Sequence, residues 1–342
     1  MDSEYFKTLK VLEKRYRVEK REKDWLGLPI VTFRTGGREE PPVLIAAGAV
    51  GTEPAGVYAA LELVMQVDVE RKVYVLPARD PTGFHDVSYV LSRMLREDVR
   101  VNNLQDLRSL LLSRGAEVVL EGHGIFLALL KGVGFAFSEK EARRGAYDTL
   151  EALEREVVKG GLADSLEEVR ILVPAQMPGV EGVGEMGRLL TVMVSNGRLL
   201  TYDDLMSGGR LIPEAVMFRK FLDSIEPGMV VDLHEGWSKS FHVLVSDEPT
   251  SGEWIIIDVM LEQVARYGMR LATVRDVESS GYSALRDGVA MKPGACGLAD
   301  YAKNYGYSFA FVTGRLQPLE QRIRAHVTAC LSALNAYAIA RL

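Results

Sequence analysis

The sequence contains little cysteine and histidine and has no long hydrophobic run. Its 342 residues include two cysteines and five histidines. Two cysteines cannot form a disulfide framework, and no Cys-x-x-Cys motif is available for zinc or redox chemistry. The longest apolar runs, such as Val43–Val50 and Ile125–Leu130, are far too short to span a bilayer, so we expect no membrane partner. The N-terminal residues carry charges of mixed sign rather than a secretory core, and we therefore expect a cytoplasmic protein.

The remaining composition describes an ordinary globular protein. Charged residues make up 26% of the chain, and its length suits one large domain with a sizeable core. The formal charge of −6 argues against nucleic acid as a main partner. Arginine outnumbers lysine, and asparagine and glutamine are few. That pattern is typical of heat-adapted proteins, and a GC-rich genome explains it equally well.

From Leu28 onward, short apolar segments alternate with helical patterns. This alternation predicts an α/β fold: a twisted, mixed, mostly parallel sheet with helices on both faces. We expect a single domain over residues 1–342, with residues 87–188 as an insertion or subdomain within it and residues 1–25 as a charged helix. Phe241–Val245 follows the apolar strand Met229–Leu233 closely and is predicted to return beside it as a hairpin.

In open α/β sheets, functional sites form at the carboxyl ends of the strands. Four predicted strand ends carry polar or glycine-rich segments, and we expect the site among them. The segments are Gly48–Pro54, Pro77–Gly83, Asp232–Gly236 and Ser308–Gly314.

Two of these segments resemble motifs of the zinc carboxypeptidase superfamily, especially its succinylglutamate desuccinylase/aspartoacylase branch. Ala47–Gly56 reads A-G-A-V-G-T-E-P-A-G and is similar to the family's A-G-x-H-G-x-E-P-A-G, whose His and Glu bind zinc. Asp232–His234 is similar to the D-L-H that supplies the third ligand. The resemblance therefore implies a carboxypeptidase-like fold, Glu53 and His234 as metal ligands, and an ancestry among hydrolases of amide bonds.

Two valines depart from this pattern. Val50 stands where the family has its first zinc ligand, and Val312 stands where the resemblance places the glutamate that acts as general base. Catalytic zinc normally takes three protein ligands and a water, and a general base contributes roughly 10²–10⁴-fold in rate. We therefore expect zinc to bind weakly or not at all. The favoured interpretation is a protein that lacks the standard zinc-hydrolase mechanism and binds a ligand or a partner in the cleft that corresponds to the family's active site.

The alternative is a metal-dependent hydrolase of amide bonds, a deacylase or a carboxypeptidase, with a rebuilt metal site. Glu53 and His234 would then be joined by His242 or by His85, which follows another strand end. His242 and His85 can equally be packing or surface residues. Asp232 can orient His234 from behind, as carboxylates commonly do for metal-binding histidines.

Four residues are candidates for holding a small-molecule or peptide ligand. Asn196 and Arg198 are the nearest counterparts of the family's D-L-N-R, whose Asn and Arg hold the substrate carboxylate. Arg79 and Arg210 could bind an anion through both arms of the guanidinium group. Each arginine can also be a surface or ion-paired residue.

Overall fold

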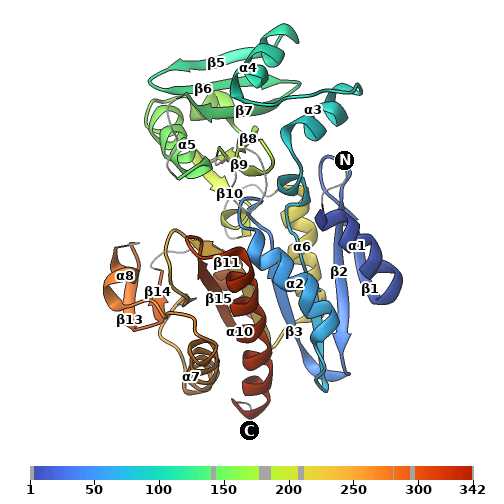
Figure 1. Ribbon diagram of the computed structural model, residues 1–342, viewed down its shortest axis with the longest axis vertical. Coiled ribbons are helices and arrows are strands. Elements are labelled where there is room, and N and C mark those ends of the chain that lie inside the picture. Colours follow the sequence, from blue (N-terminus) through green and yellow to red (C-terminus); the bar gives the residue numbers. More distant parts are fainter. Residues whose placement is uncertain are drawn as a thin grey trace.

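The computed structural model describes residues 4–139, 144–176, 186–206, 212–279, 281–292 and 297–340. These residues form two sheets, one above the other in the view of Figure 1, and each sheet carries its own helices. No described helix is long and apolar enough to cross a membrane.

The larger sheet has nine strands in the order β1-β2-β4-β3-β11-β15-β12-β14-β13. The neighbours among β4, β3, β11 and β15 are parallel, whereas β1, β2, β12 and β13 introduce antiparallel pairs at the two flanks. The sheet is therefore mixed: its central strands are parallel, and at one flank β12 also pairs with β14 in parallel. Its strands are β1 (Arg17–Lys23), β2 (Pro29–Gly36), β3 (Glu39–Ala47), β4 (Arg71–Leu76), β11 (Met229–Gly236), β12 (His242–Val245), β13 (Ser283–Arg286), β14 (Val289–Met291) and β15 (Tyr307–Gly314).

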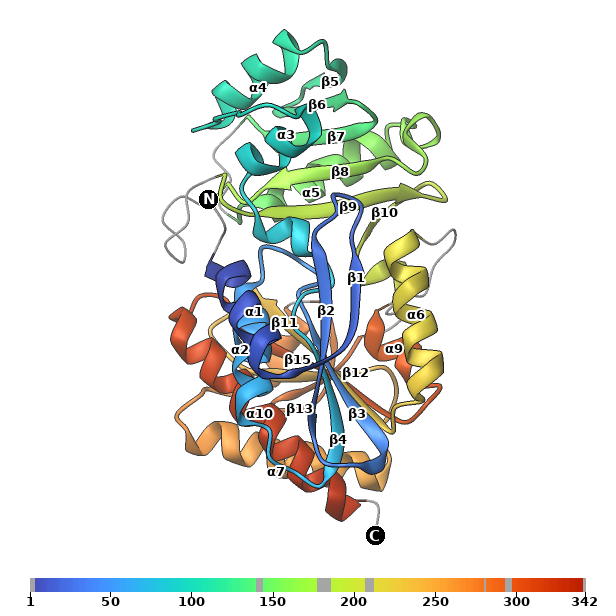
Figure 2. The same cartoon turned by 90° about the vertical axis from the view of Figure 1, so that its right-hand side faces the viewer.

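Helices pack on both faces of this sheet, as Figure 2 shows. Alternate residues of β3 point to opposite faces, so Val43 and Ile45 pack against one layer of helices and Leu44 and Ala46 against the other. The first layer is α1 (Glu4–Arg15), α2 (Pro54–Gln66), α7 (Ser251–Arg266) and α10 (Leu319–Ala340); the second is α6 (Pro213–Ile225) and α9 (Leu298–Ala302). This double burial explains why the central strands are apolar throughout.

The second sheet has six strands in the order β10-β9-β8-β7-β6-β5, and only its β7–β8 pair is parallel. Helices α3 (Val87–Leu95) and α4 (Leu104–Ser113) cover one face, and α5 (Ala146–Leu153) covers the other. The strands are β5 (Glu117–Gly122), β6 (Ile125–Leu130), β7 (Val133–Ser138), β8 (Arg170–Pro174), β9 (Leu189–Ser195) and β10 (Arg198–Thr201).

Three details of the predicted organisation were wrong. The second sheet extends through β10, so its residues run beyond 188, and β9 does not belong to the main sheet. Residues 1–25 are not one helix, because α1 ends at Arg15 and the alternating charges of β1 suit an edge strand. Finally, β12 does not pair with β11, because β15 lies between them.

The turn after β3 lies at the junction of the two sheets. A Cβ atom on Gly51 would lie 2.4 Å from the Cα atom of Gly83 and 2.4 Å from the carbonyl oxygen of Leu189 in β9. Only glycine fits such a close approach of three backbones. The contact places the turn that carries Glu53 beneath the second sheet and beside the carboxyl end of β11.

Candidate functional site

A cavity of about 640 Å³ opens at the carboxyl ends of β11 and β15. Main-sheet residues form most of its wall, and α5 of the second sheet closes it from above. The lining residues used below are Glu53, Arg144, Tyr147, Asp203, Asp232, His234, Gly236, His242, Tyr282, Lys292, Val312 and Arg315.

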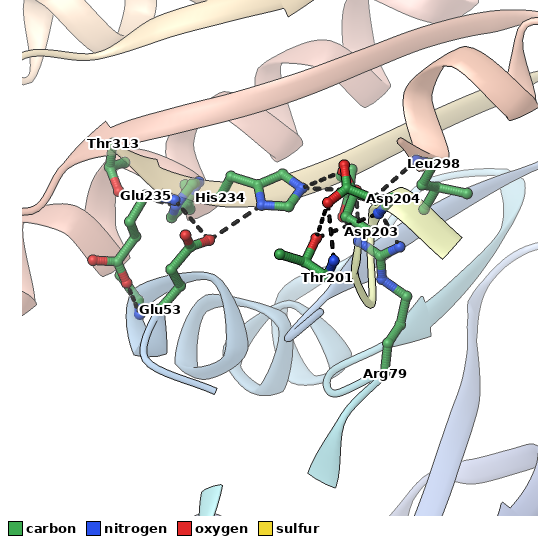
Figure 3. Close-up of polar contacts among 12 residues, drawn as sticks. Glu53, Arg79, Thr201, Asp203, Asp204, His234, Glu235, Leu298 and Thr313 are labelled. Carbon is green, nitrogen blue, oxygen red and sulfur yellow. Dashed lines mark hydrogen bonds and ion pairs between the residues drawn. The ribbon is translucent and has the colours of Figure 1, made fainter. Parts of the chain in front are cut away.

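His234 lies among three carboxylates at the end of β11 (Figure 3). Its Nδ1 atom is 3.1 Å from Glu53 Oε2, and its Nε2 atom is 2.9 Å from Asp232 Oδ2. Asp203 Oδ2 lies 3.7 Å from the same Nε2 atom. Burial disfavours the charged imidazole, but Asp232, Glu53 and Asp203 outweigh it and raise the pKa of His234 well above its ordinary value. Both ring nitrogens are therefore engaged as donors of an imidazolium whose side chain is 16% exposed.

Glu53 joins the two sheets at this point. It precedes α2, whose first residue is Pro54, without capping the helix through its side chain. Its carboxylate accepts hydrogen bonds from Tyr147 Oη at 2.5 Å and from the Glu235 N–H at 3.2 Å. Burial opposes ionisation, but the hydrogen bonds and charge of His234 hold the pKa of Glu53 below its ordinary value. Glu53 is thus an anion bonded to the imidazolium of His234 and to a tyrosine of α5.

Arg79 forms the far side of this cluster. Its Nη2 atom donates to both oxygens of Asp232, at 2.7 and 2.6 Å, and its Nη1 atom donates to Asp203 at 3.1 Å. The side chain is 5% exposed, and it does not line the cavity. The buried Asp232 and the partly exposed Asp203 therefore already occupy its guanidinium group, and substrate binding by Arg79 stays a prediction.

Val50 and Val312 lie in different surroundings. Val50 is buried in the apolar cluster beneath the second sheet, with Ile125 and Leu190. Val312 lines the cavity and lies opposite His234 in the β11–β15 register. The residue at the predicted base position therefore faces the site, but it carries no proton acceptor.

His242 does not join His234 as a metal ligand. Val312 lies between them in register, opposite His234 on one side and His242 on the other. Two strand spacings separate their backbones by about 10 Å. The predicted hairpin would have brought the two imidazoles together, but the actual strand order keeps them apart.

The other predicted site residues lie elsewhere. His85 is stacked between Phe6 and Tyr89, with ring centroids 4.1 and 3.8 Å away, in the packing of α1 and α3. Asn196 and Arg198 are exposed in the β9–β10 turn of the second sheet and do not reach the cavity. Arg210 falls outside the described residues.

One group of three possible metal ligands occurs in the described part of the chain: Asp203, Asp232 and His234. A cation there would compete with Arg79 for both Asp232 oxygens and with the proton on His234 Nε2. On the other side of the ring, Glu53 and His234 lack a third donor at the position that the resemblance assigns to Val50, which is buried in the apolar cluster beneath the second sheet. The donor set therefore does not fit a resident zinc with three free protein ligands and an open water position.

The sequence motifs did not indicate four of the cavity residues used here. Tyr147 and Asp203 lie in stretches with no recognisable motif, and Arg315 follows directly after the strand-end segment Ser308–Gly314. No hydrogen bond or ion pair of the Arg315 guanidinium is found within the described ranges; its Cζ atom lies 5.8 Å from the Tyr147 ring centroid. Lys292 likewise lines the cavity without an ion pair to any described residue.

The face of β15 opposite Val312 carries a buried histidine contact. His326 of α10 is fully buried, and its Nε2 atom lies 3.1 Å from Thr313 Oγ1. Burial chiefly lowers the pKa of His326, to about 3. In the unfolded chain its pKa returns to about 6.5, so acid favours unfolding.

We therefore expect His326→Gln to flatten the acid side of the stability profile. The contribution of His326 is fully present above pH 6.5 and is lost as pH falls toward its folded pKa. Between pH 7 and pH 5 the wild type should lose about 2 kcal/mol more free energy of unfolding than the variant. Urea unfolding at both pH values measures the difference, and equal losses in the two proteins would contradict a neutral, buried His326.

No protein-family model matches the chain, and no curated protein matches it either. Among solved structures, it is similar to a metallo-carboxypeptidase from Pseudomonas aeruginosa in complex with (2-guanidinoethylmercapto)succinic acid: TM-score 0.51, 10% identity, 98% of this chain and 68% of that chain covered. A metallo-carboxypeptidase from Burkholderia cenocepacia matches with TM-score 0.47 and 9% identity over 98% of this chain and 68% of that chain. The first likeness shows the fold alone. The chain is thus an α/β protein of carboxypeptidase-like fold, and that part of the prediction is confirmed.

Proposed function

We propose that this carboxypeptidase-like protein, of the succinylglutamate desuccinylase/aspartoacylase type, binds a small peptide-like carboxylate in its cavity without the zinc-hydrolase mechanism. The observation that carries the proposal is the state of His234. Both of its ring nitrogens are bonded to carboxylates. The resemblance assigns Val50 and Val312 to the two other positions that the mechanism requires. The composition suggests that this protein works in the cytoplasm.

The charge distribution in the cavity favours a carboxylate ligand. Most lining carboxylates are neutralised: Glu53 by His234, Asp203 and Asp232 by Arg79 and His234. Arg315 and Lys292, in contrast, have no ion pair within the described residues, although both line the wall. A guanidinium group offers the paired donors that a carboxylate accepts. The cavity therefore offers cationic groups at Arg315 and Lys292, beside the carboxylate of Asp300, and these cations suit an acidic ligand such as an N-acylated amino acid or a short peptide.

Isothermal titration calorimetry with N-acetyl-L-amino acids and dipeptides tests this function. We expect wild-type binding and a ten- to hundredfold weaker affinity for Arg315→Gln, because a charge-assisted hydrogen bond contributes about 1.5–3 kcal/mol. Arg198→Gln, in the exposed turn of the second sheet, is the matched control and should bind like the wild type. Absence of binding to every carboxylate probe, with the protein folded, would refute the proposal.

A metal-dependent amide hydrolase is the second candidate. The closeness of Asp203, Asp232 and His234 favours it, as does the short distance between Glu53 and His234. Under this alternative a metal ion would replace the proton on the His234 ring and the guanidinium group of Arg79 as the partner of these carboxylates. Metal analysis of the purified protein separates the two functions. Stoichiometric zinc that His234→Ala abolishes would support the hydrolase, and its absence after dialysis against zinc would support the binding protein.

A further inference from the structure

Helix α5 and the residue just before it bring side chains of the second sheet into the cavity. Arg144, Tyr147, Leu150 and Glu151 line the wall, and the last three share one face of the helix because they lie three or four residues apart. The Arg144 guanidinium is already paired, with Asp148 at 3.0 Å and with Glu151 at 2.6 Å. Tyr147 is therefore the residue through which we expect the second sheet to act on the ligand site.

Tyr147 contacts two separate segments of the main sheet. Its hydroxyl donates a hydrogen bond to Glu53 Oε1 at 2.5 Å, and its ring centroid lies 5.8 Å from Arg315 Cζ. Glu53 directly precedes α2, and Arg315 directly follows β15. One side chain from α5 thus joins the turn that carries Glu53 to the arginine that carries the proposed carboxylate binding.

The ring of Tyr147 is the contact that orients the Arg315 side chain. The main chain of Arg315 is fixed, because its N–H donates to the Gly236 carbonyl at 2.8 Å. The guanidinium group has no hydrogen bond within the described ranges, and its buried Nε atom is without a partner there. A long side chain that is held by nothing loses conformational entropy when it binds a ligand. Stacking on an aromatic ring restricts the guanidinium plane in advance and leaves its N–H edge available.

The hydroxyl of Tyr147 acts on the carboxylate that competes with the ligand for Arg315. Glu53 Oε2 already accepts from His234 Nδ1 at 3.1 Å and from the Glu235 N–H at 3.2 Å. Its other oxygen, Oε1, accepts from Tyr147. Without that hydroxyl, Oε1 would be a free anionic acceptor close to the ring on which Arg315 stacks, and an ion pair with Glu53 would withdraw the guanidinium from the ligand.

We propose that Tyr147 is a positioning residue of the ligand site: its ring holds the Arg315 guanidinium toward the ligand carboxylate, and its hydroxyl keeps Glu53 from pairing with that guanidinium. The inference rests on the proposed function and gives the second sheet a part in it, since the site is complete only when α5 is docked on the main sheet. Tyr147 acts through Arg315 and does not itself bind the ligand.

Isothermal titration calorimetry with N-acetyl-L-phenylalanine tests this role. Tyr147→Leu removes both contacts, and we expect about tenfold weaker binding; Tyr147→Phe keeps the ring and should bind about threefold more weakly. In the Arg315→Gln background both substitutions should have almost no further effect, because Tyr147 acts through Arg315. Tyr267→Leu is the matched control, since Tyr267 is 66% exposed at the end of α7 and should leave the affinity unchanged.

A second measurement needs no ligand. The Nε–H resonance of Arg315 in the NMR spectrum is identified by its loss in Arg315→Gln. We expect Tyr147→Leu to shift this resonance, because the ring current of Tyr147 is lost, and Tyr147→Phe to keep it near the wild-type position. A resonance that stays in place in a folded Tyr147→Leu protein would contradict the stacking on which the inference depends.

The titration also separates this inference from the proposed function. Wild-type binding that Tyr147→Leu leaves within twofold would overturn the positioning role and leave carboxylate binding intact. A tenfold loss that persists in the Arg315→Gln background would mean that Tyr147 contacts the ligand or only supports the fold, and this result would overturn the inference as well. If the wild type binds no carboxylate probe, the proposed function fails first and the inference with it.

Discussion

Replacing Arg79 by methionine should lower the free energy of unfolding by about 3–5 kcal/mol, the effect of removing one partner from a buried ion pair. Asp232 is 1% exposed and would lose the group that donates to both its oxygens. Asp203 would lose a 3.1 Å contact and keep the N–H of Leu298. Urea unfolding of the ligand-free protein measures this loss. A structural role of Arg79 predicts the same loss whether or not a ligand is bound.

Arg198→Met provides the comparison, since Arg198 was an equally plausible ligand-binding arginine in the sequence. It is exposed, so its replacement should change stability by less than about 0.5 kcal/mol. Arg79→Lys should fall between the two, because a single ammonium group cannot make the two-armed contact. If Arg79→Met unfolds within about 1 kcal/mol of the wild type but loses carboxylate binding, Arg79 is a binding residue after all.

The sequence predicted the centre of the fold well, because that part is determined by local pattern. Val43–Ala47 and Met229–Leu233 are apolar at every position, which is typical of strands covered on both faces. Glycine and proline occur in the turns that follow these strands. The flanks were harder to predict. Whether β12 pairs with β11 or with β15 depends on long-range contacts that no local pattern encodes.

The same difference between local pattern and long-range contact explains which residues of the site could be predicted. Glu53 and His234 meet as expected, because each lies at the end of a central parallel strand and such ends converge at one edge. His242 was placed beside His234 by a predicted hairpin, and His85 because it follows another strand end. The actual strand order separates His242 from His234, and aromatic stacking holds His85 away from the cavity. Tyr147 and Asp203 could not have been found, since they reach the cavity only through the packing of the second sheet against the first.

A second large effect is expected at Arg322, which links α10 to the carboxyl end of β11. Its side chain is fully buried, its Nη1 atom pairs with Glu235, and its Nε atom donates to the Gln317 carbonyl at 3.0 Å. Glu235 in turn accepts the first-turn N–H of α2, from Ala55, at 2.5 Å. Arg322→Met would leave the Glu235 carboxylate buried without its cation, and we expect a loss of about 3–5 kcal/mol in the free energy of unfolding.

Arg324, two residues further along the same helix, is exposed and provides the matched control. Arg324→Met should change stability by less than about 0.5 kcal/mol. Adding Glu235→Gln to Arg322→Met removes the carboxylate charge that has lost its cation. The double variant should therefore be more stable than the sum of the two single losses predicts. Because the backbone N–H of Glu235 also donates to Glu53, Arg322→Met should weaken carboxylate binding in the folded protein as well. Strictly additive losses in this double-mutant cycle would show that Arg322 and Glu235 act independently and that the contact does not hold the Glu53 turn in place.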